Sequence, residues 1–354
     1  MGDQATAEIS FRSDNVATVC PEILQALAAA NHGPAASYGD DEHSRALNAA
    51  FSTLFETPVT VFPVSTGTAA NALALAACAR PYGGIYCNEH AHIHTAEGGA
   101  TEAFTGGAKL IPLPGEHFRL SPDSLRGAVS HAERGVRNKP QPDAVSITQA
   151  SEHGTVYPLD EIAALGEIAR GAGIKFHMDG ARFANALVTL GCTPAEMTWR
   201  RGVDILSFGA TKNGAMSAEA IVVFDPALVE PLSYRLRSAG QTWSKMRFAA
   251  VQLIAYIEGG LYLRLAGRSN ALASRLAQAV VELPGVSLIA PVEANLLFLS
   301  MPPTVIDALV AEGVRVGRRS ETVIRLVTRF DGKEEDIDRF IEIARRAARL
   351  TNGG

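Results

Sequence analysis

Short apolar runs of about five to nine residues alternate with longer amphipathic stretches over the first two-thirds of the chain. Runs of the first kind predict strands, and stretches with apolar residues every three or four positions predict helices. The pattern therefore predicts an α/β fold, with a mostly parallel central sheet and helices on both faces. Strands are expected at 59–65, 83–89, 108–114, 142–150, 174–179, 203–210 and 219–225, and helices at 67–80, 121–133 and 158–173.

The pattern changes near residue 260, where 258–285 predicts one long, interrupted helix. We therefore expect an N-terminal arm at 1–14, a large domain at 15–258 and a small C-terminal α+β domain at 259–354. A chain of 354 residues is long enough for two such domains. The tail has strands expected at 286–290, 294–300, 313–317 and 323–328, and helices at 303–313 and 333–350.

Composition narrows the classes of partner. A net charge of -5 gives no electrostatic reason to bind nucleic acid or anionic membranes, and 6% aromatic residues disfavour base-stacking surfaces. No apolar run approaches the ~18 residues of a membrane span. The four cysteines show no metal or redox spacing, which predicts reduced thiols. We expect a cytoplasmic protein with a small-molecule partner.

The stretch FHMDGARFANA, at 176–186, places charge where a buried strand leaves the sheet. Asp179 and Arg182 lie three residues apart among small residues, where a charge is costly unless something binds it. These two side chains therefore indicate a binding site.

The stretch VSTGTAAN, at 64–71, ends a predicted strand and begins a helix of small residues. Backbone N–H groups and the dipole at such a helix start favour a phosphate. The glycine spacing fits neither a nucleotide P-loop nor a dinucleotide-binding loop. An ordinary turn is the alternative interpretation.

A lysine, Lys212, follows another predicted strand in SFGATKNGA. The carboxyl ends of strands in open α/β sheets are where ligands bind, and an amine there can condense with a carbonyl. A lysine in a polar surface loop is the alternative interpretation.

Three histidines alternate in NEHAHIHTAEGGA, so His90, His92 and His94 would share one face of an extended segment. No cysteine or helically spaced carboxylate stands beside them to complete a zinc site, and we predict no metal. One imidazole can instead lie flat against an aromatic cofactor while another carries a proton. Solvated loop histidines are the other alternative.

Together these parts describe a site for pyridoxal 5'-phosphate. The Lys212 amine would hold its aldehyde, the helix start at 67 its phosphate, and the Asp179 carboxylate its ring nitrogen. A charged ring nitrogen would also neutralise Asp179 inside the protein. Arg182 would face a carboxylate or an oxygen of the cofactor.

The chain resembles the low-specificity L-threonine aldolases, which have the aspartate-aminotransferase-like fold (fold type I) of pyridoxal phosphate enzymes. The resemblance runs over nearly the whole chain. It rests on the stretches FRSDNVATVCPEILQAL, ASYGDDEHS, STGTAAN, HIHTAEGGA, HMDGARFANA, SFGATKNGA, SKMRFAA, VEANLLFL and VIRLVTRFD.

The resemblance implies roles around the cofactor. Lys212 would be the Schiff-base lysine, Asp179 the partner of the ring nitrogen and His92 the imidazole stacked on the ring. Gly67 and Thr68 would hold the phosphate.

It also implies roles for more distant residues. Ser13, Arg182 and Arg325 match residues that hold the substrate carboxylate, and Tyr38 would wall the pocket. Arg247 resembles an arginine that reaches the cofactor phosphate of a neighbouring subunit, which implies a homodimer or homotetramer with shared sites.

The expected reaction is the retro-aldol cleavage of L-threonine, L-allo-threonine and related β-hydroxy-α-amino acids to glycine and an aldehyde. The base for the hydroxyl proton is left open among His92, His94, Glu97 and water. Alternatives are a phenylserine-preferring aldolase, a β-eliminating lyase, and a regulatory protein that binds without turnover.

One departure from the family concerns the segment after the strand at 142–150. Many relatives carry an Asn-Thr-His sequence there, whose histidine is associated with the substrate's β-hydroxyl. Here the chain has Ser151, Glu152 and His153, and whether His153 replaces that histidine is left open. Selection between threo and erythro substrates is left open with it.

Overall fold

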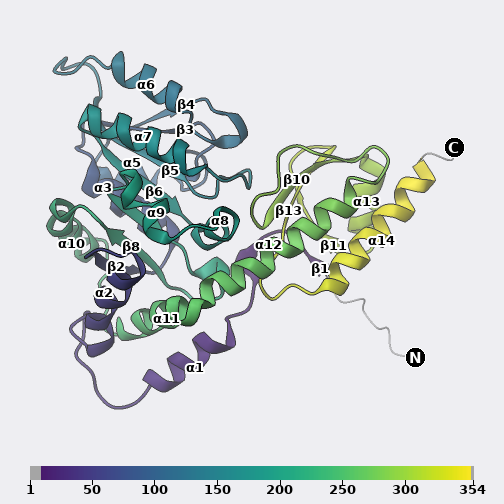
Figure 1. Ribbon diagram of the computed structural model, residues 1–354, viewed down its shortest axis with the longest axis horizontal. Coiled ribbons are helices and arrows are strands. Elements are labelled where there is room, and N and C mark those ends of the chain that lie inside the picture. Colours follow the sequence, from purple (N-terminus) through teal and green to yellow (C-terminus); the bar gives the residue numbers. More distant parts are fainter. Residues whose placement is uncertain (1–8, 352–354) are drawn as a thin grey trace.

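The computed structural model describes residues 9–351, which form a large and a small domain joined by one long helix (Figure 1). Residues 1–8 of the predicted arm and 352–354 of the predicted small domain lie outside the described residues. Of the arm, Ile9 and Phe11 pack into the core of the small domain.

A seven-stranded sheet forms the centre of the large domain, and all seven strands predicted there are confirmed. Only β8 runs antiparallel to its neighbours, and the other pairs are parallel. The strand order is β2 (Thr60–Val64), β8 (Glu219–Val223), β7 (Ile205–Phe208), β6 (Lys175–Gly180), β5 (Gln141–Thr148), β3 (Gly83–Asn88) and β4 (Lys109–Leu113).

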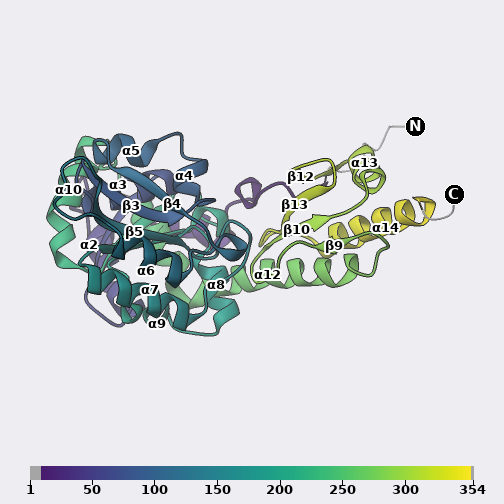
Figure 2. The same ribbon diagram turned by 90° about the horizontal axis from the view of Figure 1, so that it is seen from above.

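Helices cover both faces of this sheet (Figure 2), so the predicted α/β architecture is confirmed. The three predicted helices appear as α3 (Gly67–Cys78), α6 (Pro122–Ser130) and α7 (Leu159–Ala172). On one face, α3 lies with α5 (Ala100–Thr105) and α10 (Val229–Ser238). The opposite face carries α6, α7 and α9 (Pro194–Met197). Further helices of this domain are α1 (Pro21–Ala30), α2 (Glu42–Leu54), α4 (His92–Thr95), α8 (Phe183–Leu190) and α11 (Arg247–Ile257).

The small domain has a four-stranded antiparallel sheet covered by helices. Its order is β12 (Gly317–Arg318), β13 (Val323–Val327), β10 (Leu296–Ser300) and β9 (Ser287–Leu288), and its helices are α13 (Pro303–Ala311) and α14 (Glu334–Thr351). The prediction of a single strand at 313–317 was wrong, because two short strands occupy this stretch. The chain changes partner there: β11 (Val314–Arg315) pairs with β1 (Ile9–Ser10), and β12 pairs with β13.

The helix predicted at 258–285 is shorter than expected, because it begins after two glycines in the left-handed region. Gly259 has φ 58° and Gly260 has φ 71°, and α12 (Leu261–Val280) follows them. Leu265 packs in the core of the large domain and Leu276 in that of the small domain. This helix therefore couples the two cores.

The prediction that no apolar run approaches the length of a membrane span was also wrong. The helical stretch Arg247–Val280 is long and apolar enough to pass as a membrane span by length and composition. However, 56% of its apolar window is buried within the protein, as in the core helix of a globular fold.

Candidate active site

A cavity of about 360 Å³ lies at the carboxyl ends of β5, β6 and β7. Residues as far apart in the sequence as Gly67 and Lys212 meet in it. The predicted site residues that line it are Gly67, Thr68, His92, Glu97, Asp179, Arg182 and Lys212.

The carboxylate of Asp179 is 4% exposed, near the end of β6. Its Oδ1 accepts a hydrogen bond from the backbone N–H of Ala181 (2.9 Å), and its Oδ2 accepts one from Nδ2 of Asn71 (2.8 Å). No cation pairs with it among residues 9–351. The site therefore holds a buried negative charge that a ligand cation can balance.

His177, two residues before Asp179 on β6, is fully buried between two hydroxyl groups. Its Nδ1 lies 2.8 Å from the Ser146 hydroxyl, and its Nε2 lies 2.9 Å from the Ser207 hydroxyl. Burial lowers the pKa of His177 to about 4, although Asp179 opposes this effect. The imidazole is therefore neutral at physiological pH.

Lys212 lies in the short 3-10 turn η4 (Thr211–Asn213) after β7. The next residue anchors this turn, because Nδ2 of Asn213 donates to the Tyr256 hydroxyl (2.7 Å) and to the Tyr262 carbonyl (2.9 Å). Within the described range, the Lys212 amine makes no hydrogen bond or ion pair. Its backbone is fixed while its amine is available for reaction.

The first turn of α3 offers unpaired donors to the same cavity. Thr66 caps the helix by accepting from the Ala69 N–H (3.1 Å). The N–H groups of Gly67 and Thr68 have no acceptor in the part of the chain that the structure describes. A Cβ on Gly67 would meet nothing within 4 Å, so the space above the turn is open. This end of the cavity suits an anion.

A buried hydrogen-bond network joins His92 to Asp179. Nδ1 of His92 lies 2.8 Å from Oε1 of Glu97, and Nδ2 of Asn71 donates to that oxygen (2.9 Å) as well as to Asp179. The hydrogen bond to Glu97 raises the pKa of His92 despite partial burial. Asn71 was not predicted as a site residue, although it is a polar residue in the mostly apolar run of α3.

The prediction that His90, His92 and His94 share one face of an extended segment was wrong. His92–Thr95 forms α4, and a helix turns successive side chains by about 100°. His94 is exposed and does not line the cavity, whereas the ring of His90 stacks on Phe118 at 4.0 Å. No group of three or more metal-ligating side chains suits a metal ion within residues 9–351.

Arg182 is held by an aspartate that the sequence analysis did not single out. Its Nε and Nη2 donate to the two oxygens of Asp14 at 2.9 and 3.0 Å, and Asn295 also donates to Asp14 (3.0 Å). Burial opposes ionisation of Asp14, but Arg182, Lys212 and Asn295 outweigh it and lower its pKa. Arg182 is thus fixed, and its remaining N–H groups are free for a ligand.

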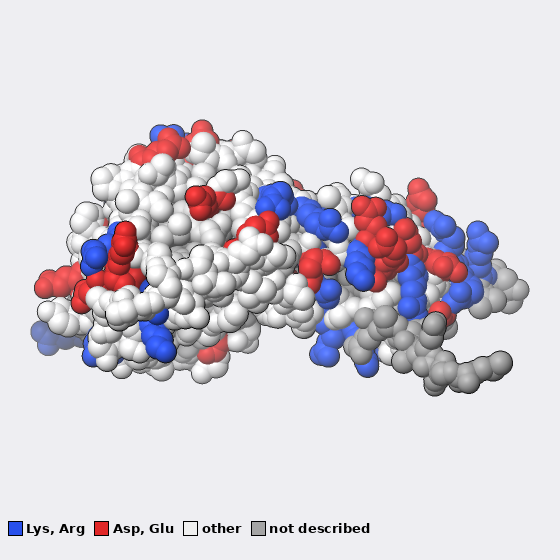
Figure 3. Space-filling view, turned by 90° about the horizontal axis from the view of Figure 1, so that it is seen from below, with Lys and Arg blue, Asp and Glu red and all other residues white. Residues whose placement is uncertain are grey.

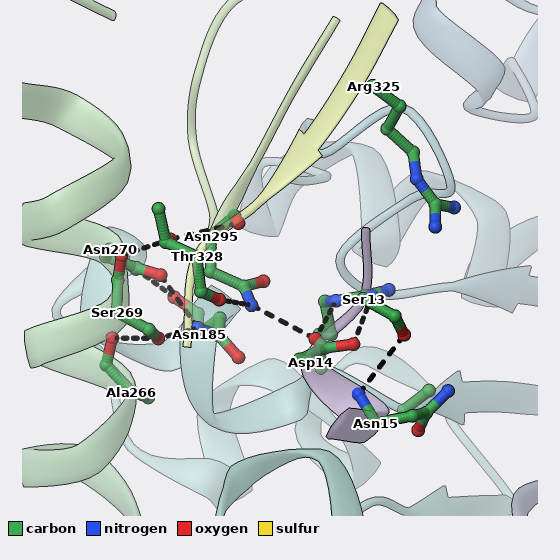
Figure 4. A network of polar contacts seen from close by, with 12 residues as sticks. Ser13, Asp14, Asn15, Asn185, Ala266, Ser269, Asn270, Asn295, Arg325 and Thr328 are labelled. Carbon is green, nitrogen blue, oxygen red and sulfur yellow. Dashed lines mark hydrogen bonds and ion pairs between the residues drawn. The ribbon is translucent and has the colours of Figure 1, made fainter. Parts of the chain in front are cut away.

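Ser13 and Arg325 do not line the cavity. Ser13 accepts a hydrogen bond from the backbone N–H of Asn15 (3.1 Å), and Asn15 does line it (Figure 4). Arg325 extends from β13 towards the segment with Ser13 and Asn15, and its Nη2 donates to the Arg12 carbonyl (3.0 Å). Its buried Nε has no partner among the described residues. Burial, with the neighbouring guanidinium groups of Arg319 and Arg182, lowers the pKa of Arg325 to about 10. A bound carboxylate would stabilise this cation.

Two of the predicted residues lie away from the cavity of their own chain. Tyr38 is 50% exposed and has Arg237 stacked over its ring at 4.7 Å. Arg247 donates to the Gly33 carbonyl (3.2 Å) and lies over the Phe248 ring.

Comparison with known proteins supplies independent findings. Residues 10–302 match the family model described as beta-eliminating lyase. The chain is 43% identical over 339 residues to a low specificity L-threonine aldolase from Pseudomonas aeruginosa, covering 95% of this chain and 96% of that protein. It is 44% identical over 305 residues to a low specificity L-threonine aldolase from a Pseudomonas species, covering 86% and 88% of the two chains.

A solved structure shows the same arrangement of both domains. The threonine aldolase of Leishmania major superposes with a TM-score of 0.89 at 27% identity, over 96% of this chain and 99% of that one. The predicted fold is thereby confirmed over nearly the whole chain.

Proposed function

The chain belongs to the beta-eliminating lyase family, and from that premise we propose that it is a carbon–carbon lyase of the L-threonine aldolase type. It cleaves L-threonine, L-allo-threonine and related β-hydroxy-α-amino acids to glycine and an aldehyde. The observation that carries this proposal is the single cavity in which Lys212, Asp179 and the first turn of α3 meet.

Proteins of this family depend on pyridoxal 5'-phosphate, and we propose that the cavity binds it in this chain. The residues present fit that cofactor. The free amine of Lys212 suits its aldehyde, the buried carboxylate of Asp179 suits its ring nitrogen, and the N–H groups of Gly67 and Thr68 suit its phosphate. His92 also lines the cavity, and its imidazole would hold the ring there. When bound, the cofactor supplies a ring that accepts the electron pair of the broken bond.

The substrate carboxylate binds at the edge of the cavity near Arg325 and Ser13. Arg325 has an unpaired Nε there, and Arg182 contributes the N–H groups that Asp14 leaves free. Two guanidinium groups would bind the carboxylate and so fix the orientation of the amino acid in the cavity.

The hydroxyl proton needs an acceptor within the cavity. Of the side chains proposed from sequence, His92 and Glu97 line the cavity and His94 does not. Nδ1 of His92 is bonded to Glu97, which leaves its Nε2 for the substrate or a water molecule.

We also propose that the chain associates with itself and shares its active sites. Arg247 and Tyr38 lie outside their own cavity, which leaves them available to a neighbouring subunit. Figure 3 shows charged side chains gathered over the small domain and a broad surface of the large domain with few charges. Exposed apolar side chains of the large domain include Val16, Leu24, Met216 and Tyr234.

The test incubates the purified holoprotein separately with L-threonine, L-allo-threonine, L-phenylserine and L-serine. Glycine with the matching aldehyde supports the proposal, whereas pyruvate with ammonia supports a β-eliminating lyase instead. The Lys212→Ala variant should lose both the visible absorbance of the bound cofactor and the cleavage. Cleavage that survives this substitution would overturn the assignment.

A further inference from the structure

Glu152 is an acidic residue of the cavity that has no role in the reaction as described so far. It lies in the loop between β5 and α7 and lines the same cavity as Lys212, Asp179 and His92. Glu152 therefore borders the space that a substrate would occupy.

The two oxygens of the Glu152 carboxylate differ in their partners. Oε1 accepts hydrogen bonds from the Thr148 hydroxyl (2.8 Å) and from the backbone N–H of His92 (2.6 Å). Oε2 is shielded from solvent and has no partner among the described residues. An oxygen of this kind needs a donor, and a ligand hydroxyl would be one.

The loop that carries Glu152 is held in place on both sides. The backbone N–H of Ser151 donates to the Thr155 carbonyl (2.8 Å), and the Ser151 hydroxyl donates to the His117 carbonyl (3.1 Å). On the other side, the Val156 N–H donates to Oε2 of Glu293, from the small domain (2.8 Å). The free oxygen is therefore presented by a rigid frame.

The surroundings of Glu152 also bring the pKa of its carboxyl group close to neutral pH. Burial raises the pKa of Glu152 to about 7, and Asp179 adds to this effect, while the hydrogen bonds from Thr148 and the His92 N–H oppose it. No ion pair joins it to a cation within residues 9–351. A group with a pKa near the working pH is suited to general acid–base transfer.

The other carboxylates of the cavity have different partners. Glu97 also has an unpartnered Oε2, but its Oε1 is bonded to His92 and to Asn71, and its side chain is 0% exposed. Oε2 of Glu219 accepts a hydrogen bond from the backbone N–H of Ala210 (2.6 Å). Both oxygens of Asp179 already accept hydrogen bonds, and its charge is required at the opposite side of the site.

We propose that Glu152 is the catalytic residue whose Oε2 accepts the proton of the substrate's β-hydroxyl group, an inference that rests on the proposed aldolase function. As the O–H bond breaks, the oxygen forms the C=O bond of the aldehyde. The Cα–Cβ bond breaks, and its electron pair goes to Cα. Cα then takes up one proton and Glu152 releases one, so that threonine becomes glycine and acetaldehyde without any other reactant.

Glu152→Gln is the sharpest test, because it keeps the shape of the side chain. The donors at Thr148 and His92 N–H fix the amide oxygen in the place of Oε1, so the amide nitrogen takes the place of Oε2 and cannot accept a proton. Glu102→Gln is the matched control, since Glu102 also has a buried, unpartnered Oε2 but does not line the cavity.

Two reactions of the holoenzyme separate this role from the proposed function itself. Cleavage of L-threonine requires a β-hydroxyl group, whereas exchange of the Cα deuterium of labelled glycine with water does not. We expect Glu152→Gln to lower kcat for cleavage by about 10²- to 10⁴-fold and to leave glycine exchange near the wild-type rate. Glu102→Gln should change neither.

The pH dependence of the cleavage rate separates a catalytic role of Glu152 from a purely structural one, which would not change it. The wild-type cleavage rate should rise with pH through about 7, since Glu152 accepts a proton only when ionised, and this rise should be lost in Glu152→Gln. The wild type must bury the charge of ionised Glu152 as the pH rises from 5 to 8, whereas the Gln variant buries no charge there. The denaturation midpoint of the variant should therefore rise relative to that of the wild type over this pH range.

Each outcome decides between the possibilities. Equal loss of cleavage and exchange, or no loss of either, overturns the role of Glu152 while the aldolase assignment stands. A wild-type enzyme that yields no glycine from threonine overturns the aldolase function and this role with it. Should the Gln variant fail to fold, Glu152→Asp must lower cleavage and spare exchange, because it retains the carboxyl group but shortens its reach.

Discussion

His177 makes the stability of the protein depend on pH. It is buried and neutral in the folded state, and its pKa falls from 6.5 to about 4. Between pH 6.5 and pH 4, His177 binds a proton in the unfolded chain but not in the folded protein. The free energy of unfolding therefore falls as the pH drops towards 4. The full effect corresponds to about 3 kcal/mol.

We therefore expect His177→Gln to weaken this pH dependence. Urea denaturation at pH 5 and pH 7 should show a smaller difference in the free energy of unfolding than in the wild type. The exposed His131 provides the control, and His131→Gln should retain the wild-type difference. If His177→Gln keeps the wild-type difference between pH 5 and pH 7, other groups cause the loss of stability at low pH.

At the scale of elements, the loop from Gln149 to Tyr157 connects the active site to the small domain. Gly154 has φ 85°, and a Cβ there would lie 2.5 Å from Cδ1 and 2.8 Å from the carbonyl oxygen of Leu296, at the start of β10. The ring of His153 also meets Phe298 of β10 edge-on at 4.6 Å. The position of this loop, and of Glu152 within it, depends on β10.

Gly154→Ala should displace this loop. Gly173→Ala is the control, because Gly173 has φ 63° and a Cβ there meets nothing within 4 Å. Both variants bear the left-handed strain of about 1 kcal/mol, and the clash should cost Gly154→Ala roughly 1–3 kcal/mol more. Denaturation and threonine cleavage measure the two effects. Equal stability and activity in both variants would contradict the coupling.

At the scale of the whole molecule, shared active sites predict complementation between inactive subunits. Lys212→Ala removes the amine from one site, and Arg247→Ala removes the arginine proposed for the neighbouring site. In a 1:1 mixture assembled at random, half of the dimers are mixed and each contains one complete site, which gives about a quarter of the wild-type activity.

Coexpression of the two variants and assay of the purified mixture measure this recovery. The mixed dimers, isolated through two different affinity tags, should have about half of the wild-type activity. Each variant expressed alone provides the baseline. Mixed dimers without activity would place Arg247 in the site of its own subunit. An Arg247→Ala variant that is active when expressed alone would place Arg247 in no site.

The pattern of apolar residues determined much of the architecture, because burial of apolar surface acts on periodicity that is written locally. All seven strands of the large sheet and the helices α3, α6 and α7 lie where the pattern places them. The prediction of one strand at 313–317 was wrong. The stretch divides into β11, which pairs with β1, and β12, which pairs with β13, and pairing with β1 depends on a segment distant in sequence.

Local motifs also specify which residue types stand at the ends of strands. Lys212, Asp179 and the start of α3 follow from motifs of a few residues, because turns and helix starts are local structures. In contrast, the packing of the complete fold sets which side chains share hydrogen bonds. Asn71 joins Glu97 to Asp179, and Asp14 fixes Arg182 from 168 positions away. Such contacts arise when packing brings distant segments together, and no local pattern encodes those distances.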